Sequence, residues 1–376
     1  MASLDDALSR LEPVDADAAE AAAHRQASFT KPDGSLGALE ALGSRLAAVA
    51  GRCPPPVPAH PVVAVFAGDH GVFSEGVSPW PEGATAEMVA NVLKGGAAIN
   101  VIARQVGAAV VVVDAGMVTT LPDPGDASTD GDGETRRGRL VAAKVRAGTA
   151  NLVVEPALSL EEARRSIQVG LSIADRLVDQ GSDLLVTGEM GAGNTTPAAA
   201  IVAAVTGWPA RAVTGRGSGI SDEMLDKKIA VVESGLERVA AAHSVATTAL
   251  SSLDGDVLLS ELGGLEIGAV AGVVIGGALR RVPVVVDGLG SLAGALVAVK
   301  LAPAAADYLV AGHRSVEPGA TAAMEHLGLE PLLDMRLGLG EGTGGCLAVP
   351  IVQAAARLLS EMATSGDAAV PASTEE

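Results

Sequence analysis

Two glutamates lie in glycine-rich segments, where a carboxylate can reach a bound molecule. Glu341 has glycines on both sides in MRLGLGEGTGG, and Glu189 lies in TGEMGAGNTT. Glycine lets the main chain approach a ligand closely, and a carboxylate on such a loop can remove a proton as a general base. We expect this role for Glu341. The alternative is an ordinary solvated loop charge, because loops carry many exposed polar residues.

The residues after Glu189 have the composition of an anion site. They follow an apolar run and precede an alanine-rich stretch that predicts a helix, whose free N–H groups would bind phosphate. The expected amides are those of Gly191, Ala192, Gly193, Asn194 and Thr195. A plain strand-to-helix turn is the alternative. A carboxylate beside an anion needs a task, and accepting a proton or binding a cationic ring would give Glu189 one.

A dinucleotide site of the GxGxxG type is a weaker hypothesis for the same segment. Gly191 and Gly193 fit its first two glycines, but the third position holds Thr196. No acidic residue lies within 211–219, where one would bind the ribose hydroxyls. An NAD-dependent oxidoreductase and a non-catalytic nucleotide-binding module therefore remain as alternative functions, to be separated by NAD reduction and by nicotinate release.

The segment GVSPWPEG places a hydroxyl beside an aromatic ring. Ser78 and Trp80 would offer a hydrogen bond and a flat apolar surface to a heteroaromatic molecule, although Trp80 could equally pack the loop. A helix is expected from about Ala84. His70 and His313 match no metal-binding spacing, so we expect hydrogen-bonded structural histidines. We expect no metal and no cofactor.

Five short runs rich in Val, Leu and Ala must position these residues. They are separated by stretches long enough for a helix, which is the βαβ pattern of a parallel sheet. The runs cover 62–68, 108–116, 182–189, 282–288 and 307–313. Each run ends in small or polar residues. Ligands bind outside the carboxyl ends of parallel strands, so the sequence predicts one active-site crevice there.

Composition agrees with this α/β fold and limits the partners. The chain has 376 residues, of which 48% are hydrophobic and only 2% aromatic, so small aliphatic residues must fill the core of a sheet covered on both faces. A net charge of -19 argues against nucleic acid and anionic membranes. The N-terminus lacks a signal-peptide pattern, and the apolar run 267–279 is too short to span a bilayer, so we expect a cytoplasmic protein.

Nine segments in order give the chain a family resemblance. They are KPDGSLGALE, FAGDHGVFSEGVS, GGAAIN, DAGM, GEMGAGNTT, GRGSG, LGGLEIGAVAG, GHRSVEPGA and LGEGTGG. Together they resemble the motif series of the nicotinate-nucleotide:dimethylbenzimidazole phosphoribosyltransferases, from about Lys31 to about Leu359. The resemblance implies a large Rossmann-like domain, a small helical domain made from both termini, and a homodimer with active sites near the subunit contact.

The resemblance also implies a reaction and residue roles. Nicotinate mononucleotide and 5,6-dimethylbenzimidazole would give α-ribazole 5′-phosphate and nicotinate, with inversion at the ribose carbon. Glu341 would be the proton acceptor, Glu189 and Lys228 would line the nucleotide side, and Ser78 would face the benzimidazole. Glu87 stands where many members have glutamine, which leaves the base preference open.

The phosphate must be held locally in so acidic a chain. Lys228 is the expected cation, Ser315 the expected additional hydroxyl donor, and Arg314 the next cation to consider. We expect an N-terminal helical part of the small domain at 1–58, a large α/β domain at 59–305, and a C-terminal part at 306–362 that carries the Glu341 loop. The acidic stretch 122–138 is expected to be dispensable, and 363–376 to be a disordered tail.

Overall fold

A six-stranded parallel sheet forms the centre of the molecule. The computed structural model describes residues 3–81, 83–121, 138–217 and 219–364. The strands are β1 (Pro61–Gly68), β2 (Ala109–Gly116), β3 (Arg139–Ala142), β4 (Leu184–Met190), β5 (Val284–Val286) and β6 (Leu309–Ala311). Their order is β3-β2-β1-β4-β5-β6, and every pair is parallel. The Rossmann-like sheet and its five predicted strands are confirmed, whereas β3 was not predicted.

Both faces of the sheet are buried. Successive side chains of a strand point to opposite sides, so each strand contributes to a core on either face. In β1, Val62, Ala64 and Phe66 enter the larger core, and Val63, Val65 and Ala67 enter the core on the other face. The larger core is covered by α6 (Leu160–Asp179), α7 (Thr195–Thr206), α10 (Gly255–Leu262), α11 (Leu265–Leu279) and α12 (Leu289–Leu301). The helices α8 (Ala210–Val213), α9 (Asp222–Ala242) and α13 (Pro318–Leu327) pack outside them.

Small residues set the spacing of the covering helices. Helices α6 and α11 cross so closely that a Cβ atom on Gly170 would lie 1.8 Å from the carbonyl oxygen of Ala269. A side chain at that position would therefore force the helices apart. This close approach is how a core with few aromatic residues is filled without voids.

The opposite face is covered by helices from the middle and the end of the chain. They are α4 (Ala84–Leu93), α5 (Ala98–Val106), α14 (Thr343–Leu347) and α15 (Val349–Glu361). The stretch Thr343–Glu361 is long and apolar enough to cross a membrane by length and composition, but 56% of it is buried inside the protein. Its apolar residues serve the core: Cys346, Val349 and Val352 are fully buried against the sheet.

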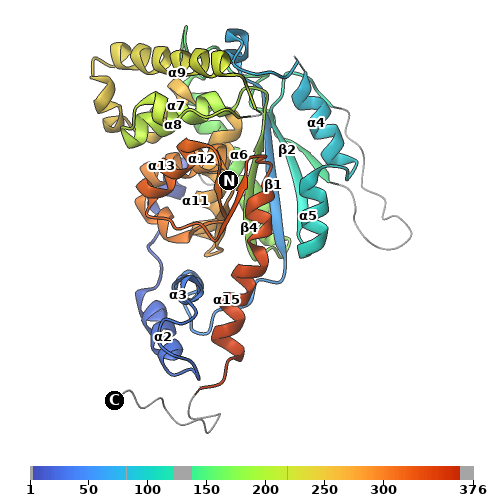
Figure 1. The fold of residues 1–376 in the computed structure, drawn as a ribbon, viewed down its shortest axis with the longest axis vertical. Coiled ribbons are helices and arrows are strands. Elements are labelled where there is room, and N and C mark those ends of the chain that lie inside the picture. The colour runs from blue at the N-terminus through green and yellow to red at the C-terminus, as the bar shows by residue number, and fades with distance from the viewer. Residues whose placement is uncertain (1–2, 82, 122–137, 218, 365–376) are drawn as a thin grey trace.

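A small helical unit joins the two ends of the chain. Helices α2 (Ala16–Ala27) and α3 (Ala38–Ala50) lie beside the far end of α15, below the sheet in Figure 1. Phe29 and Leu359 share a small core there, and Phe29 pairs with Thr364 in an isolated bridge. The predicted small helical domain from both termini is present, and it orders the first two residues of the expected tail.

Two elements differ from the expected division at residues 58 and 305. Helix α1 (Leu4–Ser9) packs Leu4 and Ala7 into the main core, not into the small unit. Strand β6 lies beyond residue 305 yet pairs with β5 in the large sheet, because its apolar residues complete both faces of that sheet. Most of the acidic stretch, 122–137, and residues 365–376 lie outside the described residues.

Short elements link the sheet to the loops at its carboxyl edge. Strands β7 (His313–Ser315) and β8 (Leu333–Leu337) pair in a separate parallel ribbon directly before the Glu341 loop. This ribbon was not predicted. The remaining turns are the 3₁₀ helices η1 (Gly71–Glu75), η2 (Thr247–Ser252) and η3 (Pro303–Tyr308). The ribbon carries the chain from β6 back over the strand ends, which places Glu341 above β4.

Candidate active site

A cleft lies at the carboxyl ends of the strands, where the order of the sheet reverses between β1 and β4. Such a switch point is where open α/β sheets bind ligands. The cleft encloses about 890 Å³ with its solvent-filled mouth. Its lining includes these expected site residues: Ser78, Trp80, Glu189, Gly191, Ala192, Gly193, Asn194, Thr195, Lys228, Ser315 and Glu341. Segments far apart in the sequence therefore meet at one edge of the sheet.

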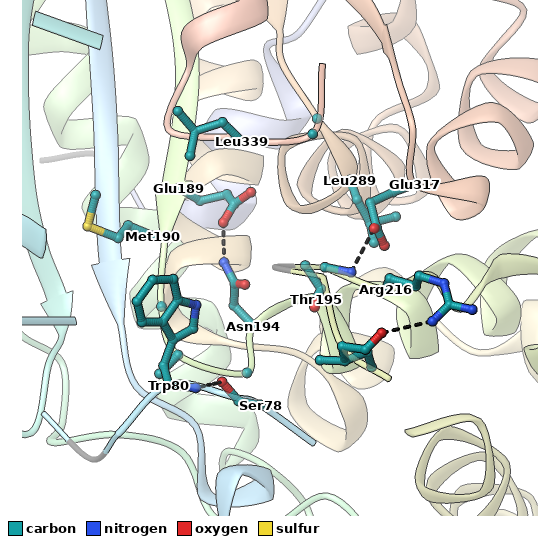
Figure 2. A pocket seen from close by; sticks show the side chains of 18 of the residues that line it. Ser78, Trp80, Glu189, Met190, Asn194, Thr195, Arg216, Leu289, Glu317 and Leu339 are labelled. Carbon is teal, nitrogen blue, oxygen red and sulfur yellow. Dashed lines mark hydrogen bonds between the residues drawn. The ribbon is translucent and has the colours of Figure 1, made fainter. Parts of the chain in front are cut away.

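The cleft has an aromatic end and a polar end. Figure 2 shows Trp80 and Ser78 at the lower left, Glu189 above them, and Arg216 and Glu317 on the right. Half-buried Ser78 accepts a hydrogen bond through Oγ from the main-chain N–H of Trp80 at 3.4 Å. Trp80 is 44% exposed and lines the cleft. This end suits a flat apolar ring.

Glu189 lies at the centre of the cleft, near the end of the buried strand β4. Asn194 Nδ2 donates a hydrogen bond to its Oε2. Burial raises the pKa of Glu189 to about 8, and the negative charges of Glu266, Asp287 and Glu341 add to this effect. The Glu189 carboxyl is therefore mostly protonated at neutral pH.

Glu341 is half-buried, not a solvated loop charge, and it faces the same cleft. Its φ is 62°, and Gly340 and Gly342 beside it have φ of 80° and 83°. Burial raises the pKa of Glu341 to about 6, with a further contribution from the charge of Asp287. Glu341 is therefore mostly ionised at neutral pH, while Glu189 is mostly neutral. Two acids with separated pKa values suggest different chemical roles.

The polar end combines a buried lysine with the start of helix α7. Lys228 is 1% exposed, and its Nζ donates to Thr195 Oγ1 at 2.8 Å and to the carbonyl oxygen of Gly215 at 3.0 Å. Burial lowers the pKa of Lys228 to about 8, against the opposing charge of Glu317. Ser315 lines the same end and accepts through Oγ from the Glu317 N–H at 3.3 Å.

Only some of the expected amides are available to an anion. Ala192 N–H donates to Thr85 Oγ1 at 3.0 Å, and Asn194 N–H donates to the carbonyl oxygen of Gly191 at 3.2 Å. Within the described part of the chain, the N–H groups of Gly193 and Thr195 have no acceptor. These two amides and the Lys228 ammonium are therefore among the donors that this end of the cleft offers.

Known proteins share this architecture and sequence. A family model described as "Phosphoribosyltransferase" matches residues 11–370. The nicotinate-nucleotide–dimethylbenzimidazole phosphoribosyltransferases of Chloroflexus aurantiacus and Salinispora tropica are 50% and 48% identical, over 96% and 95% of this chain and 97% and 96% of theirs. The chain belongs to this phosphoribosyltransferase family. A crystal structure of the same enzyme from Thermus thermophilus matches with a TM-score of 0.85 and 43% identity, covering 96% of this chain and all of that one.

Membership of the phosphoribosyltransferase family favours a transferase over the oxidoreductase alternative. One expected residue does not reach the cleft: Glu87 is exposed and does not line it, whereas Met88 does. Successive residues of a helix point about 100° apart. Thr85 and Met88 share the inward face of α4, so Glu87 points to solvent and cannot contact a ring in the cleft directly.

Several residues of this phosphoribosyltransferase cleft were missed by sequence reasoning. Among them, Glu317 is buried and accepts a hydrogen bond from the Gly217 N–H at 2.8 Å, and Arg216 and Leu339 line the cleft. Each lies within two residues of a glycine-rich or predicted segment, which was the available signal. Arg314 instead pairs with Asp334 at 3.3 Å, outside the lining, so Arg216 is the second cation of the cleft.

The two histidines of the strand-end turns are paired with acids. His70 Nε2 lies 3.0 Å from Glu266 Oε1, and His313 Nδ1 lies 3.4 Å from Asp287 Oδ1. Burial is the largest single influence and lowers the pKa of His70, but the charge of Glu266, its hydrogen bond to the ring and the charge of Asp69 together outweigh burial and raise the pKa. Among the described residues there is no group of three or more His, Cys, Asp or Glu side chains that could hold a metal ion.

Proposed function

We propose that the protein transfers the phosphoribosyl group of nicotinate mononucleotide to 5,6-dimethylbenzimidazole or a related base. The products are α-ribazole 5′-phosphate and nicotinate, with inversion at the ribose carbon. The family and its relatives support the reaction class. The observation that carries the residue roles is the pair of acids with separated pKa values between an aromatic end and an anion-binding end.

The leaving group needs no acid. Nicotinate is joined to ribose through its ring nitrogen, so it carries a positive charge that is neutralised when the bond breaks. One benzimidazole nitrogen forms the new bond to the same carbon. The proton on its other nitrogen becomes acidic as charge builds on the ring, and it must be removed. The chemistry therefore requires a base on the side of the incoming ring.

Glu341 is the base that fits this requirement. It lines the cleft on a loop after β8, and with a pKa of about 6 it is ionised at neutral pH and still basic enough to accept a proton. Burial increases the strength of its interaction with a nearby charge. Leu339, on the same loop, offers apolar surface to the incoming base.

Glu189 serves the nucleotide side. Its carboxyl is protonated before the nucleotide binds, and the cationic nicotinate ring favours its ionised form when it enters. The resulting carboxylate stabilises the positive charge that develops on the ribose. Asn194 orients it through the hydrogen bond to Oε2. Binding of the nucleotide therefore converts a neutral acid into an electrostatic partner.

The phosphate is placed at the polar end. Lys228, the amides of Gly193 and Thr195, and the hydroxyl of Ser315 converge there. Because the chain carries a net charge of -19, these short-range contacts must hold the phosphate without help from a long-range field. Ser78 and Trp80 at the other end are assigned to the benzimidazole.

A homodimer in the cytoplasm completes the proposal. The β7–β8 ribbon and its flanks carry exposed apolar side chains, and one of them, Leu339, lines the cleft: Val316 is 54%, Met335 59% and Leu339 57% exposed. Apolar groups gathered at one edge are typical of protein contacts. Analytical ultracentrifugation at micromolar concentration tests this state, and a monomer with full activity would contradict it.

A turnover assay tests the function. Purified protein is incubated with nicotinate mononucleotide and a panel of benzimidazoles, purines and phenols, and the anomers of the products are assigned by NMR. We expect nicotinate release only with an added base, and an α-linked product with 5,6-dimethylbenzimidazole. Absence of nicotinate release with every base would leave only a nucleotide-binding module.

A further inference from the structure

Asp287 is a buried carboxylate that holds the chain just after Glu341. It follows β5 directly and is 1% exposed. Its Oδ2 accepts a hydrogen bond from the Gly342 N–H at 3.0 Å, and its Oδ1 accepts one from the Gly345 N–H at 2.8 Å. Both amides lie at the start of α14, where unpaired N–H groups favour a negative charge. The carboxylate thus fastens the loop to the centre of the sheet.

The loop needs such a fastening because its conformation is unfavourable. Gly340, Glu341 and Gly342 are consecutive left-handed residues, and only glycine adopts this conformation without cost. The loop can approach strand β4 closely because Gly188 has no side chain. A Cβ atom on Gly188 would lie 2.7 Å from the carbonyl carbon of Glu341. The main chain of Glu341 is therefore pressed onto β4, and Asp287 supplies the hydrogen bonds that keep it there.

Asp287 also places a negative charge close to Glu341. Burial is the larger cause of the raised pKa of Glu341, and the charge of Asp287 is the second. The same charge contributes, after burial, to raising the pKa of Cys346 on α14 to about 12. Other groups face this centre: Glu189 from β4 and His313 from β7, with Glu266 from α11 behind Glu189.

We propose that Asp287 is a positioning residue for the transfer reaction, which fixes the Glu341 loop over the cleft and places a negative charge beneath it. Asp287 does not line the cleft and touches no substrate. Its two effects act through Glu341, because the hydrogen bonds set where the carboxylate stands and the charge sets how readily it takes a proton. The inference rests on the proposed function in taking Glu341 as the proton acceptor.

The substitution Asp287→Asn separates charge from shape. Asparagine has the same volume, but it is neutral, and its NH₂ group faces one of the two loop amides. We expect the acidic limb of the kcat/KM profile for the benzimidazole to move about one unit toward lower pH, because a nearby negative charge has been removed. We also expect kcat at pH 8, where Glu341 is ionised in both proteins, to fall about tenfold or more through misplacement of the base.

Asp183→Asn is the matched control. Asp183 also accepts two main-chain N–H groups, those of Ala59 and His60 at 2.7 Å each, but it precedes β4 at the opposite end of the sheet. It lies outside the cleft lining. We expect this variant to keep both the position of the acidic limb and the value of kcat. If removing any aspartate that binds main-chain amides lowered kcat, the loss would appear in both variants.

An acidic limb that stays in place in Asp287→Asn, or an unchanged kcat at pH 8, would overturn the inference. If this variant does not fold, Asp287→Glu decides: it keeps the charge and displaces the carboxylate by one methylene, so the limb should stay while kcat falls. Wild-type kcat in Asp287→Glu would then overturn it. Failure of the proposed function would give a different result. If Glu341 is not the proton acceptor, the acidic limb of the kcat/KM profile would remain in Glu341→Gln.

Discussion

Lys228 and Thr195 meet at the anion end of the cleft although they belong to different helices. Lys228 Nζ, from α9, donates to the Oγ1 of Thr195, the first residue of α7, at 2.8 Å. A second hydrogen bond reaches the carbonyl oxygen of Gly215. An ammonium has three N–H donors, so within the described structure one remains for a ligand. The contact directs a buried charge toward the free amides of α7.

Replacing Lys228 with Ala should weaken binding of nicotinate mononucleotide by about ten- to hundredfold, the usual effect of losing a hydrogen bond to a charged group. Binding of the benzimidazole should stay nearly unchanged, because the lysine lies at the other end of the cleft. Calorimetric titration with each ligand measures both effects. Lys227→Ala is the control, since the neighbouring lysine is exposed and outside the lining. Wild-type affinity for the nucleotide in Lys228→Ala would disprove the phosphate placement.

Replacing Glu341 with Gln should slow transfer by about a hundredfold or more and leave the fold intact, because the amide cannot accept the proton. The acidic limb of the wild-type profile near pH 6 should disappear with it. Steady-state rates from pH 5 to 9 show both changes. Glu325→Gln, an exposed change on α13, should behave as wild type. Wild-type turnover in Glu341→Gln would refute the general-base role.

Replacing Glu341 with Gly should abolish efficient turnover while raising the melting temperature by about 2 °C, because glycine accepts a φ of 62° without strain. Thermal unfolding followed by circular dichroism measures this gain. The same change at Glu325, inside helix α13, should lower the melting temperature, since glycine weakens a helix interior. A melting temperature of Glu341→Gly below that of Glu341→Gln would show that the backbone is not strained there.

Protonation of the Glu189 carboxyl should make the folded protein less stable as the pH rises from 5 to 8. Its pKa is about 8 in the folded protein, against 4.5 for a glutamate exposed to water, so the folded state binds more protons between these limits. The contribution of Glu189 to the free energy of unfolding is therefore fully present below about pH 4.5, and it is lost as the pH rises toward 8. Glu189→Gln should reduce the difference in melting temperature between pH 5 and pH 8 by about 2 °C or more.

Calorimetry at the two pH values tests this linkage. Glu233→Gln is a suitable control because it removes an exposed glutamate from the outer face of α9. It should leave the wild-type pH dependence in place. An identical pH dependence in Glu189→Gln and wild type would mean that Glu189 is ionised before any ligand binds.

The sheet and its polar edge could be predicted because the signals are local. A run such as 62–68 is apolar at every position, which only a strand buried on both faces explains, and its polar successors lie at the edge by topology alone. The difference between the pKa values of Glu189 and Glu341 could not be predicted. The pKa of Glu189 depends on Glu266 and Asp287, which are distant in sequence and come near only when β4, β5 and α11 pack together.

The directions in which single side chains point could not be predicted from the sequence either. Glu87 and Met88 are neighbours in the sequence, yet only Met88 lines the cleft, because the choice depends on how α4 is rotated against the sheet. The short ribbon β7–β8 was missed for a related reason. Residues 333–337, LDMRL, do alternate apolar and polar side chains, but the run is short and all of its residues are half-buried or exposed. Its partner His313–Ser315 is only three residues long and lies far from it in sequence.

The loop that rests on Gly188 is synthesised after the strands that it covers. Strands β1, β2 and β4 and the amides of α7 are synthesised well before Glu341. A nascent chain that has not yet reached this residue has its central strands and its anion-binding end but no proton acceptor, and Val63 and Gly188 still lack the loop that covers them. The loop therefore closes over a sheet whose central strands are already made, and the helix α15 that packs against α2 and α3 follows directly after it.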